Sequence, residues 1–204
     1  MRLTVTTFLS LDGVYQSPGA PDEDGTGYEY GGWTAPYGDE TSGKFITAHF
    51  ASADAFLLGR KTYEIFAGYW PRVTDPDHPI AAPLNSLPKY VVTSTLTSLD
   101  WNNSTPVTGD LADEVNKLKA LPGNELQVHG SGELAQALIT HGLVDELRLM
   151  IFPVILGDGK QFFPRGPVAA AMRVADSRTT STGVTMLTLR PDGPARFGSL
   201  VEEP

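Results

Sequence analysis

Apolar side chains repeat along the chain in two patterns, which divide it into strands and helices. Residues 3–9 alternate between apolar and polar side chains, and a period of two predicts a β-strand. Leu111, Val115 and Leu118 recur at helical spacing behind Asp110, which predicts an amphipathic helix with an aspartate N-cap. Across the whole chain the patterns predict strands at 3–9, 55–58, 90–94, 125–129, 147–156, 173–178 and 184–190, and helices at 41–52, 60–67, 111–121 and 133–141.

The order of these elements predicts an α/β fold. Strands alternate with helices through most of the chain, and three strands then follow one another at the end. Such an order predicts a mostly parallel central sheet with helices on both faces and antiparallel strands at the C-terminal side. With no repeat or linker in view, we expect a single domain over residues 1–190 and a loosely held polar tail over residues 191–204.

Two long segments follow neither pattern. Residues 12–39 are rich in glycine, acids and aromatic side chains, and residues 70–88 are rich in proline. Ordered connections of such length are usually functional, and the aromatic residues of the first segment argue against disorder. Trp33 and Tyr37 therefore either stack on a flat ligand or pin the loop to the protein, and the sequence leaves both open.

Composition limits the classes of partner. The chain has 24 acidic and 15 basic residues, a net charge of -9, which argues against a general nucleic-acid or membrane surface. It has no cysteine, and its four histidines lack metal-site spacing, so we expect no disulfide and no metal centre. The N-terminus is not an apolar signal core, and no apolar run reaches transmembrane length, so we expect a cytoplasmic protein.

Residues 128–138, VHGSGELAQAL, join a predicted strand to a predicted helix through two glycines. Gly130, Gly132 and Ala135 match the dinucleotide fingerprint G-x-G-x-x-G/A. The match lies late in the chain and no strand–helix–strand unit follows it, which argues against a Rossmann fold. The spacing around Ser131 also fails the G-x-S-x-G pattern of serine hydrolases. Two interpretations remain: a phosphate site at a helix start, or a plain tight turn that uses the positive φ of glycine.

Residues 57–62, LLGRKT, form a second strand-to-helix turn. Gly59 ends the strand, and Arg60 and Lys61 begin the helix. Cations are unfavourable there because the helix dipole prefers acids, and a bound anion removes that conflict. The alternative is that both cations point into solvent. Hydroxyl groups end a third strand at residues 93–95, and the three strand ends together predict a phosphate-rich ligand such as a dinucleotide.

The ordered set of motifs resembles the dihydrofolate-reductase-like superfamily. LLGRKTYE follows the second strand, VVTSTL ends the third, and VHGSGELAQAL and GLVDELRLMIFPVILGDGKQFF lie near the end. The chain looks similar to the C-terminal reductase domain of riboflavin biosynthesis proteins and its stand-alone relatives over about residues 2–190. The resemblance implies a three-layer sandwich, NADPH as cofactor, and a homodimer formed through the strand at 147–156 and the late hairpin.

The resemblance also implies where NADPH meets the chain: the adenosine and 2′-phosphate near the second turn, the pyrophosphate at the glycine pair, and the nicotinamide beside the first strand. The implied cofactor-binding residues are Leu11, Gly13, Val14, Gly59, Arg60, Lys61, Thr62, Thr93, Ser94, Thr95, Gly130, Ser131, Gly132, Glu133 and Leu134.

Five side chains are candidates for contact with the substrate. Asp12 either donates a proton or holds an Asx-turn. His129 either donates a proton near neutral pH or is simply hydrogen-bonded, and His49 lies on the apolar face of the first helix. Trp33 and Tyr37 belong to the long loop expected to cover a heterocycle.

The sequence departs from the family pattern in three places. One is Glu133, which follows the glycines where reductases of the folate type often have arginine. The other two concern the substrate. Residues 44–52 contain no acid, whereas dihydrofolate reductases carry a carboxylate on the first helix. His129 stands where riboflavin-type reductases commonly have an acid. Both departures argue against the substrates of those two enzymes.

Our first hypothesis is an NADPH-dependent reductase that transfers hydride to a small pterin-like or pyrimidine-like heterocycle. The alternative is a non-catalytic sensor of the same fold that binds NADP(H) or another nucleotide, and a third hypothesis is flavin reduction.

Overall fold

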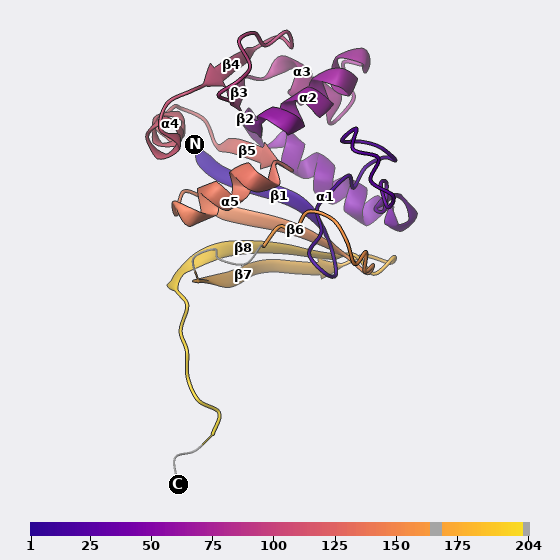
Figure 1. The fold of residues 1–204 in the computed structure, drawn as a ribbon, viewed down its shortest axis with the longest axis vertical. Coiled ribbons are helices and arrows are strands. Elements are labelled where there is room, and N and C mark those ends of the chain that lie inside the picture. The colour runs from indigo at the N-terminus through magenta and orange to yellow at the C-terminus, as the bar shows by residue number, and fades with distance from the viewer. Residues whose placement is uncertain (164–168, 202–204) are drawn as a thin grey trace.

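An eight-stranded sheet lies between two layers of helices (Figure 1) in the computed structural model, which describes residues 1–163 and 169–201. The strands are β1 (Arg2–Ser10), β2 (Ala53–Gly59), β3 (Lys89–Val92), β4 (Ser104–Val107), β5 (Glu125–His129), β6 (Glu146–Phe152), β7 (Ala170–Thr179) and β8 (Thr185–Pro194). The helices are α1 (Glu40–Ala51), α2 (Arg60–Tyr69), α3 (Ala81–Ser86), α4 (Leu111–Lys119) and α5 (Gly132–Thr140), with short 3₁₀ turns at Ala35–Tyr37 and Trp70–Arg72.

The strand order is β4-β3-β2-β5-β1-β6-β8-β7. The first six strands in this order run parallel, β8 pairs with β6 in the antiparallel sense, and β7 pairs antiparallel with β8. The predicted α/β class, with its parallel core and antiparallel C-terminal strands, is confirmed. The carboxyl ends of the parallel strands share one edge, which is where ligands bind in open α/β sheets.

Each face of the sheet carries its own core, so the central strands are apolar on both sides. Alternate residues of β2 show this: Ala55 and Leu57 pack with α4 and α5, while Phe56 and Leu58 pack with α1, α2 and α3. A third cluster, around Phe152, joins β6 and β8 to the long loop.

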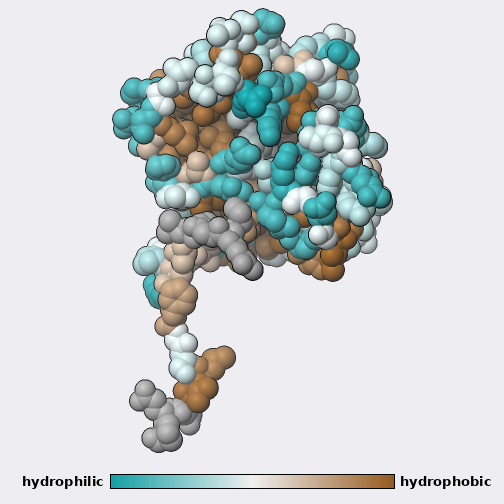
Figure 2. Space-filling model, viewed as in Figure 1, coloured by the Kyte–Doolittle hydropathy of each residue, from teal (hydrophilic) through white to brown (hydrophobic). Residues whose placement is uncertain are grey.

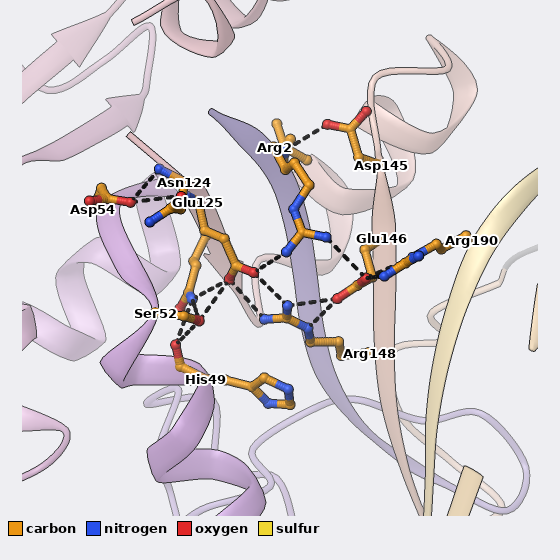
Figure 3. Close-up of polar contacts among 12 residues, drawn as sticks. Arg2, His49, Ser52, Asp54, Asn124, Glu125, Asp145, Glu146, Arg148 and Arg190 are labelled. Carbon is orange, nitrogen blue, oxygen red and sulfur yellow. Dashed lines mark hydrogen bonds and ion pairs between the residues drawn. The ribbon is translucent and has the colours of Figure 1, made fainter. Parts of the chain in front are cut away.

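The face beneath α1 also contains a buried polar layer. Arg148 of β6 forms ion pairs with Glu125 of β5 at 2.7 Å and with its own strand neighbour Glu146 at 2.6 Å (Figure 3). The three side chains are at most 5 % exposed, and the half-exposed Arg2 and Arg190 bind the same carboxylates from the outside. We call these five residues the ion cluster.

Local sequence determines where several helices begin. Asp110 caps α4 as predicted, accepting hydrogen bonds from the N–H groups of Ala112 and Asp113. Asp39 and Ser42 form a reciprocal capping box at the start of α1. Within α4, Lys117 forms an exposed ion pair with Glu114 at 2.7 Å.

Two short elements lie where the sequence predicted loops. The helix α3 forms within the proline-rich segment, and β4 adds an edge strand that contains Pro106. Proline is tolerated in β4 because an edge strand has one side free of ladder hydrogen bonds.

The two expected dimer surfaces have different environments. The strand β6 ends at Phe152, four residues before its predicted end, and lies between β1 and β8. Both hydrogen-bonding edges of β6 are therefore paired within the sheet, so this strand has no free edge to pair with a partner chain. The edge strand β7 is exposed over nearly all of its ten residues.

The C-terminal segment leaves the body of the molecule after β8 (Figures 1 and 2). The strand β8 continues to Pro194, past its predicted end at Arg190. The segment beyond it exposes Phe197, Leu200 and Val201, so the predicted polar tail carries apolar side chains as well. Residues 202–204 of that tail lie outside the described residues.

Candidate functional site

A cavity of about 880 Å³ opens at the carboxyl ends of the parallel strands. Residues from the ends of β1, β2, β3, β4 and β5 line it, together with α1, α2, the start of α5 and residues 15–19 of the loop after β1. Its position is the one that open α/β sheets use for ligands, and its size is in the upper range of small-molecule sites.

Two strand-to-helix turns form one wall of the cavity. The Arg60 turn (residues 59–62) follows β2, and the Ser131 turn (residues 130–132) follows β5. The Gly59 N–H donates to Ser131 Oγ at 3.0 Å, and the Ser131 N–H donates to Thr62 Oγ1 at 3.1 Å. The structure therefore joins the two turns that the sequence proposed as halves of one phosphate site.

Backbone conformation explains the residues of the Ser131 turn. Gly130 has a φ of +58° and Ser131 a φ of +51°, in the left-handed region that favours glycine. The serine in this strained position uses its hydroxyl and its N–H to hold the neighbouring turn.

Gly132 is required for a different reason. A Cβ atom at this position would lie 2.2 Å from Cζ of Tyr15, so only glycine lets the Tyr15 ring approach the first turn of α5. Burial raises the pKa of the Tyr15 hydroxyl, and the charges of Glu133 and Asp24 raise it further. The sequence analysis assigned no role to Tyr15, because nothing in the local pattern shows that its ring lies over α5.

The cations of the Arg60 turn both line the cavity. Arg60 is half-exposed and forms an ion pair with Glu64 at 3.0 Å, one turn along α2, while Lys61 is exposed. At the end of β3, Thr93 Oγ1 accepts from the N–H groups of Thr95 and Leu96, and Ser94 lines the cavity beside them. Twelve of the expected cofactor residues thus line one wall: Gly59, Arg60, Lys61, Thr62, Thr93, Ser94, Thr95, Gly130, Ser131, Gly132, Glu133 and Leu134.

The other expected cofactor residues, Leu11, Gly13 and Val14, do not line this cavity. Leu11 is 62 % exposed, and Val14 is buried against the segment after β6, where it pairs with Gln161. Residues 15–19, which follow Val14 in the chain, line the cavity instead.

Asp12 also lies outside the cavity lining, which argues against the expected role as proton donor. Its carboxylate accepts hydrogen bonds from the Ser10 hydroxyl at 2.6 Å and from the N–H groups of Leu156 and Gly157. Burial acts to raise the pKa of Asp12, but these hydrogen bonds lower it below its usual value. The carboxylate instead links the end of β1 to the segment after β6, in keeping with the structural alternative.

Trp33 and Tyr37 pin the long loop and do not line the cavity. The Trp33 indole N–H donates to the Gln16 carbonyl at 2.8 Å, and its ring is 6 % exposed. Both rings pack edge-on against Phe152, with centroids 5.3 and 6.0 Å away. The expected stacking of these two residues on substrate has no support in this arrangement.

His49 and His129 do line the cavity, as expected. The His129 ring stacks on Phe50 at 4.2 Å, and its Nε2 lies 2.9 Å from Gln127 Oε1. The pKa of His129 is lowered to about 3 and that of His49 to about 4, mainly by burial, and the charge of Arg148 contributes to both shifts. Both histidines are therefore neutral at physiological pH.

Comparison with known proteins places the fold and site in a family. The model of the RibD C-terminal domain family matches residues 2–186. The chain belongs to this family. It is also 34 % identical over 142 residues to the uncharacterized protein YyaP of Bacillus subtilis (strain 168), covering 69 % of this chain and 75 % of that protein.

Three solved structures share the fold of this RibD C-terminal domain. A putative riboflavin biosynthesis protein from Shewanella sp. PV-4 has a TM-score of 0.71 and 24 % identity, covering 94 % of this chain and 99 % of that one. A pyrimidine reductase-like protein from Corynebacterium diphtheriae has a TM-score of 0.60 and 14 % identity, covering 93 % and 91 %. Dihydrofolate reductase from Enterococcus faecalis, complexed with NADP(H) and RAB-propyl, has a TM-score of 0.61 and 14 % identity, covering 94 % and 96 %. The resemblance to the dihydrofolate-reductase-like superfamily is confirmed.

None of the helices in residues 1–163 and 169–201 combines the length and the apolar character needed to cross a membrane. No group of three or more histidine, aspartate or glutamate side chains there is arranged to hold a metal ion.

Proposed function

We propose that this chain is an NADPH-dependent reductase that transfers hydride to a small pterin-like or pyrimidine-like heterocycle. Membership of the RibD C-terminal domain family and the likeness to a pyrimidine reductase-like protein and a dihydrofolate reductase support a reductase-type function. The observation that carries the proposal is the pair of hydrogen-bonded turns at Gly59 and Ser131, which form one wall of a large cavity.

The wall fits a dinucleotide phosphate. The helices α2 and α5 both begin there without a side-chain cap, so their first N–H groups are free to bind phosphate oxygens. Arg60 and Lys61 add positive charge, which favours the 2′-phosphate of NADPH over the bare ribose of NADH. NADPH, when bound, supplies hydride from its nicotinamide ring.

Different residues along the cavity are assigned to different parts of the cofactor and the substrate. We assign the 2′-phosphate to Arg60 and Lys61, and the pyrophosphate to the Ser131 turn with the start of α5. At the other end, Phe8, Phe50 and His129 give the heterocycle apolar contact and one ring nitrogen. Enclosure by residues 15–19 reduces the access of water to the reacting atoms.

The proton that accompanies hydride transfer is assigned to water. Asp12 lies outside the cavity lining, and the Nε2 proton of His129 is held by Gln127. A water molecule that reaches the heterocycle would then supply this proton.

Cofactor titration tests the proposal. NADPH and NADH are titrated into the protein and followed by ligand fluorescence. We expect Arg60→Ala to weaken NADPH binding by about tenfold or more, through loss of a charge-assisted hydrogen bond, and to leave NADH nearly unchanged. Arg72→Ala, which removes an exposed arginine outside the cavity lining, is the matched control. If neither cofactor binds to the wild-type protein below millimolar concentration, the proposal is refuted. If Arg60→Ala weakens the binding of NADPH and NADH equally, the 2′-phosphate assignment is refuted.

A sensor that binds NADP(H) without turnover is the second candidate. The observation in its favour is that residues 44–51 of α1 carry no acid and that Asp12 lies outside the cavity lining. NADPH oxidation against a panel of pterins and pyrimidines separates the two: steady turnover supports the reductase, and tight binding with no turnover of any compound supports the sensor.

We also propose that the chain forms a homodimer through β7. This edge strand is exposed along almost its whole length, with Val174 60 % and Met172 37 % exposed, and long unpaired edges readily pair with another chain. Light scattering after size exclusion should give twice the mass of 21.9 kDa. Val174→Lys should shift the protein toward monomer, whereas Phe197→Lys on the extended C-terminal segment should not, and a monomeric wild-type protein would refute the proposal.

A further inference from the structure

Three residues of β5 form a hydrogen-bonded ladder that leads into the cavity. Glu125, Gln127 and His129 occupy alternate positions, so all three point toward α1, and each is at most 7 % exposed. Gln127 bonds both of its ladder neighbours, and His129 lines the cavity.

The ladder begins at a carboxylate that stays ionised. Both Glu125 oxygens accept from the Arg148 guanidinium, at 2.7 and 3.0 Å (Figure 3). Burial opposes this ionisation, but the hydrogen bonds and charge of Arg148 lower the pKa of Glu125 to about 2. Glu125 can therefore only accept hydrogen bonds.

The direction of the Gln127 amide follows from that. Its Nε2 lies 2.8 Å from Glu125 Oε2 and 2.7 Å from the backbone carbonyl of His49. Both partners are acceptors, so this atom must be the NH₂ group. The other amide atom, Oε1, is an acceptor, and it lies 2.9 Å from His129 Nε2.

The tautomer of His129 is fixed in turn. Its Nε2 must carry the hydrogen, and because the ring is neutral its Nδ1 has a free lone pair. Nδ1 has no hydrogen-bond partner among the described residues and is not among their fully buried unpartnered atoms, so it is open to the cavity that the ring lines. The ionisable groups that act on this ring are His49, Arg148 and Glu125.

Arg148 and Glu125 act on His129 but do not line the cavity, and the lining side chains beside His129 carry no formal charge. Thr6 pairs with His129 in register across β1 and β5, and its Oγ1 is buried without a partner. His49 Nδ1 is likewise buried and unpartnered, and the other lining side chains here are the apolar Phe8, Ile46, Phe50 and Phe66. The charged lining residues lie elsewhere: Arg60 and Lys61 on the Arg60 turn, Glu133 on α5, and Glu23, Asp24 and Lys160 on the loops, where Lys160 pairs with Asp24 at 3.1 Å.

We propose that the α1 end of the cavity binds an uncharged heterocycle without a phosphate group, which donates an N–H or O–H to His129 Nδ1. This inference rests on the proposed function and names the substrate class for that site. A phosphate here would lie among neutral histidines and apolar side chains, and the cation that acts on these histidines, Arg148, lies outside the lining and is already paired with Glu125 and Glu146. A ligand with only acceptors would face the His129 lone pair, and its own acceptors would stay unpaired.

The tautomer can be tested without any ligand. In protein labelled with ¹⁵N-histidine, the NMR signals of His129 should show a protonated Nε2 and a bare Nδ1 from pH 5.5 to 8. Gln127→Met should convert this state into a mixture of tautomers. A protonated Nδ1 in the wild-type protein at pH 7 would overturn the inference.

The ligand class is tested with matched pairs of probes. Uracil is compared with 1,3-dimethyluracil, and lumazine with 1,3-dimethyllumazine, by calorimetry at saturating probe. We expect an N–H member to bind at least about tenfold more tightly than its N-methyl partner. His129→Leu should remove the difference, and His141→Leu, which changes an exposed histidine, should retain it. Uridine should bind at least as tightly as uridine 5′-monophosphate.

Four outcomes of the probe experiment contradict the inference: no probe binds, the N-methyl partners bind equally well, the difference survives in His129→Leu, or the phosphorylated nucleoside binds more tightly. NADPH is titrated separately into the wild-type protein. Loss of probe discrimination with intact NADPH binding refutes this inference alone, and absent NADPH binding refutes the proposed function while the tautomer result still stands.

Discussion

Polar residues beneath α1 are the part of the site that the local sequence describes least well. Glu125, Gln127 and His129 alternate with Leu126 and Val128, which predicts a strand with one polar face. Such a face is normally solvent-exposed, yet here it is buried because α1 covers it and Arg148 neutralises it. That arginine belongs to β6, and only the fold brings it to β5, so the strand could be predicted from sequence and the burial of its polar face could not.

The same limit explains why the sequence left two roles open for Asp12 and for Trp33. An aspartate followed by glycine at a strand end fits a catalytic acid and a structural turn equally well at the sequence level. The contacts that decide between them come from Leu156, Gly157 and Phe152, which are distant in sequence.

The ion cluster predicts a large effect of losing its central cation. Arg148→Met leaves the carboxylates of Glu125 and Glu146 buried with only the half-exposed Arg2 and Arg190 for compensation. We expect the free energy of unfolding to fall by about 3–5 kcal/mol, measured by denaturant titration.

Arg178→Met is the matched control, since Arg178 forms an exposed pair with Asp176 on β7. We expect a change of less than about 1 kcal/mol there. Similar losses in the two variants would show that the cluster has no special role in stability.

At the scale of elements, the close approach of Tyr15 to α5 makes Gly132 sensitive to a single methyl group. Gly132→Ala places a Cβ inside the Tyr15 ring, so the ring must leave its edge-on contact with Phe162. We expect destabilisation by about 1–3 kcal/mol from overpacking, seen as a lower denaturation midpoint.

Gly43→Ala provides the opposite expectation. Nothing lies within 4 Å of a Cβ at that position of α1, so replacement of a helix-interior glycine should stabilise the protein by up to about 1 kcal/mol.

A double variant tests whether Tyr15 causes the expected loss in Gly132→Ala. The double variant Tyr15→Ala with Gly132→Ala should be no less stable than Tyr15→Ala alone. A further loss in the double variant would exclude the clash with Tyr15 as the cause.

The long, periodic elements could be predicted from the sequence because their apolar pattern matches their packing. The five strands predicted between residues 3 and 156 all form, as β1, β2, β3, β5 and β6, and α4 begins at its predicted cap. The short α3 and β4 were missed because prolines near or within them hide weak patterns, and tertiary contacts stabilise them. The end of β8 was missed for a related reason: residues beyond Leu189 pair only with β7, so Pro191 is tolerated there.

At the scale of the whole molecule, the buried histidines predict acid sensitivity. Burial lowers the folded-state pKa of His49 to about 4 and of His129 to about 3, against an ordinary value of 6.5. The unfolded chain therefore binds more protons than the folded chain below pH 6.5, and stability falls as the pH falls. Below pH 6.5 the free energy of unfolding should fall by on the order of 1 kcal/mol per pH unit for each histidine.

Denaturant midpoints measured from pH 7 down to pH 4.5 test this expectation. The carboxylates with lowered pKa values, such as Glu125, lose their stabilising contribution only below about pH 4.5, so this window reports the histidines. His129→Asn should reduce the slope and the exposed His141→Asn should not. An unchanged slope in His129→Asn would contradict the assignment.

The hydrogen bonds that Ser131 forms with Gly59 and Thr62 fix the distance between the starts of α2 and α5 before any ligand binds. A ligand that spans both turns meets a rigid receptor, so little conformational entropy is lost on binding. Such a rigid wall tolerates ligands of only one length between their charged groups. Selection by molecular length thus follows from two hydrogen bonds between backbone N–H groups and side-chain hydroxyls of turns that lie far apart in the sequence.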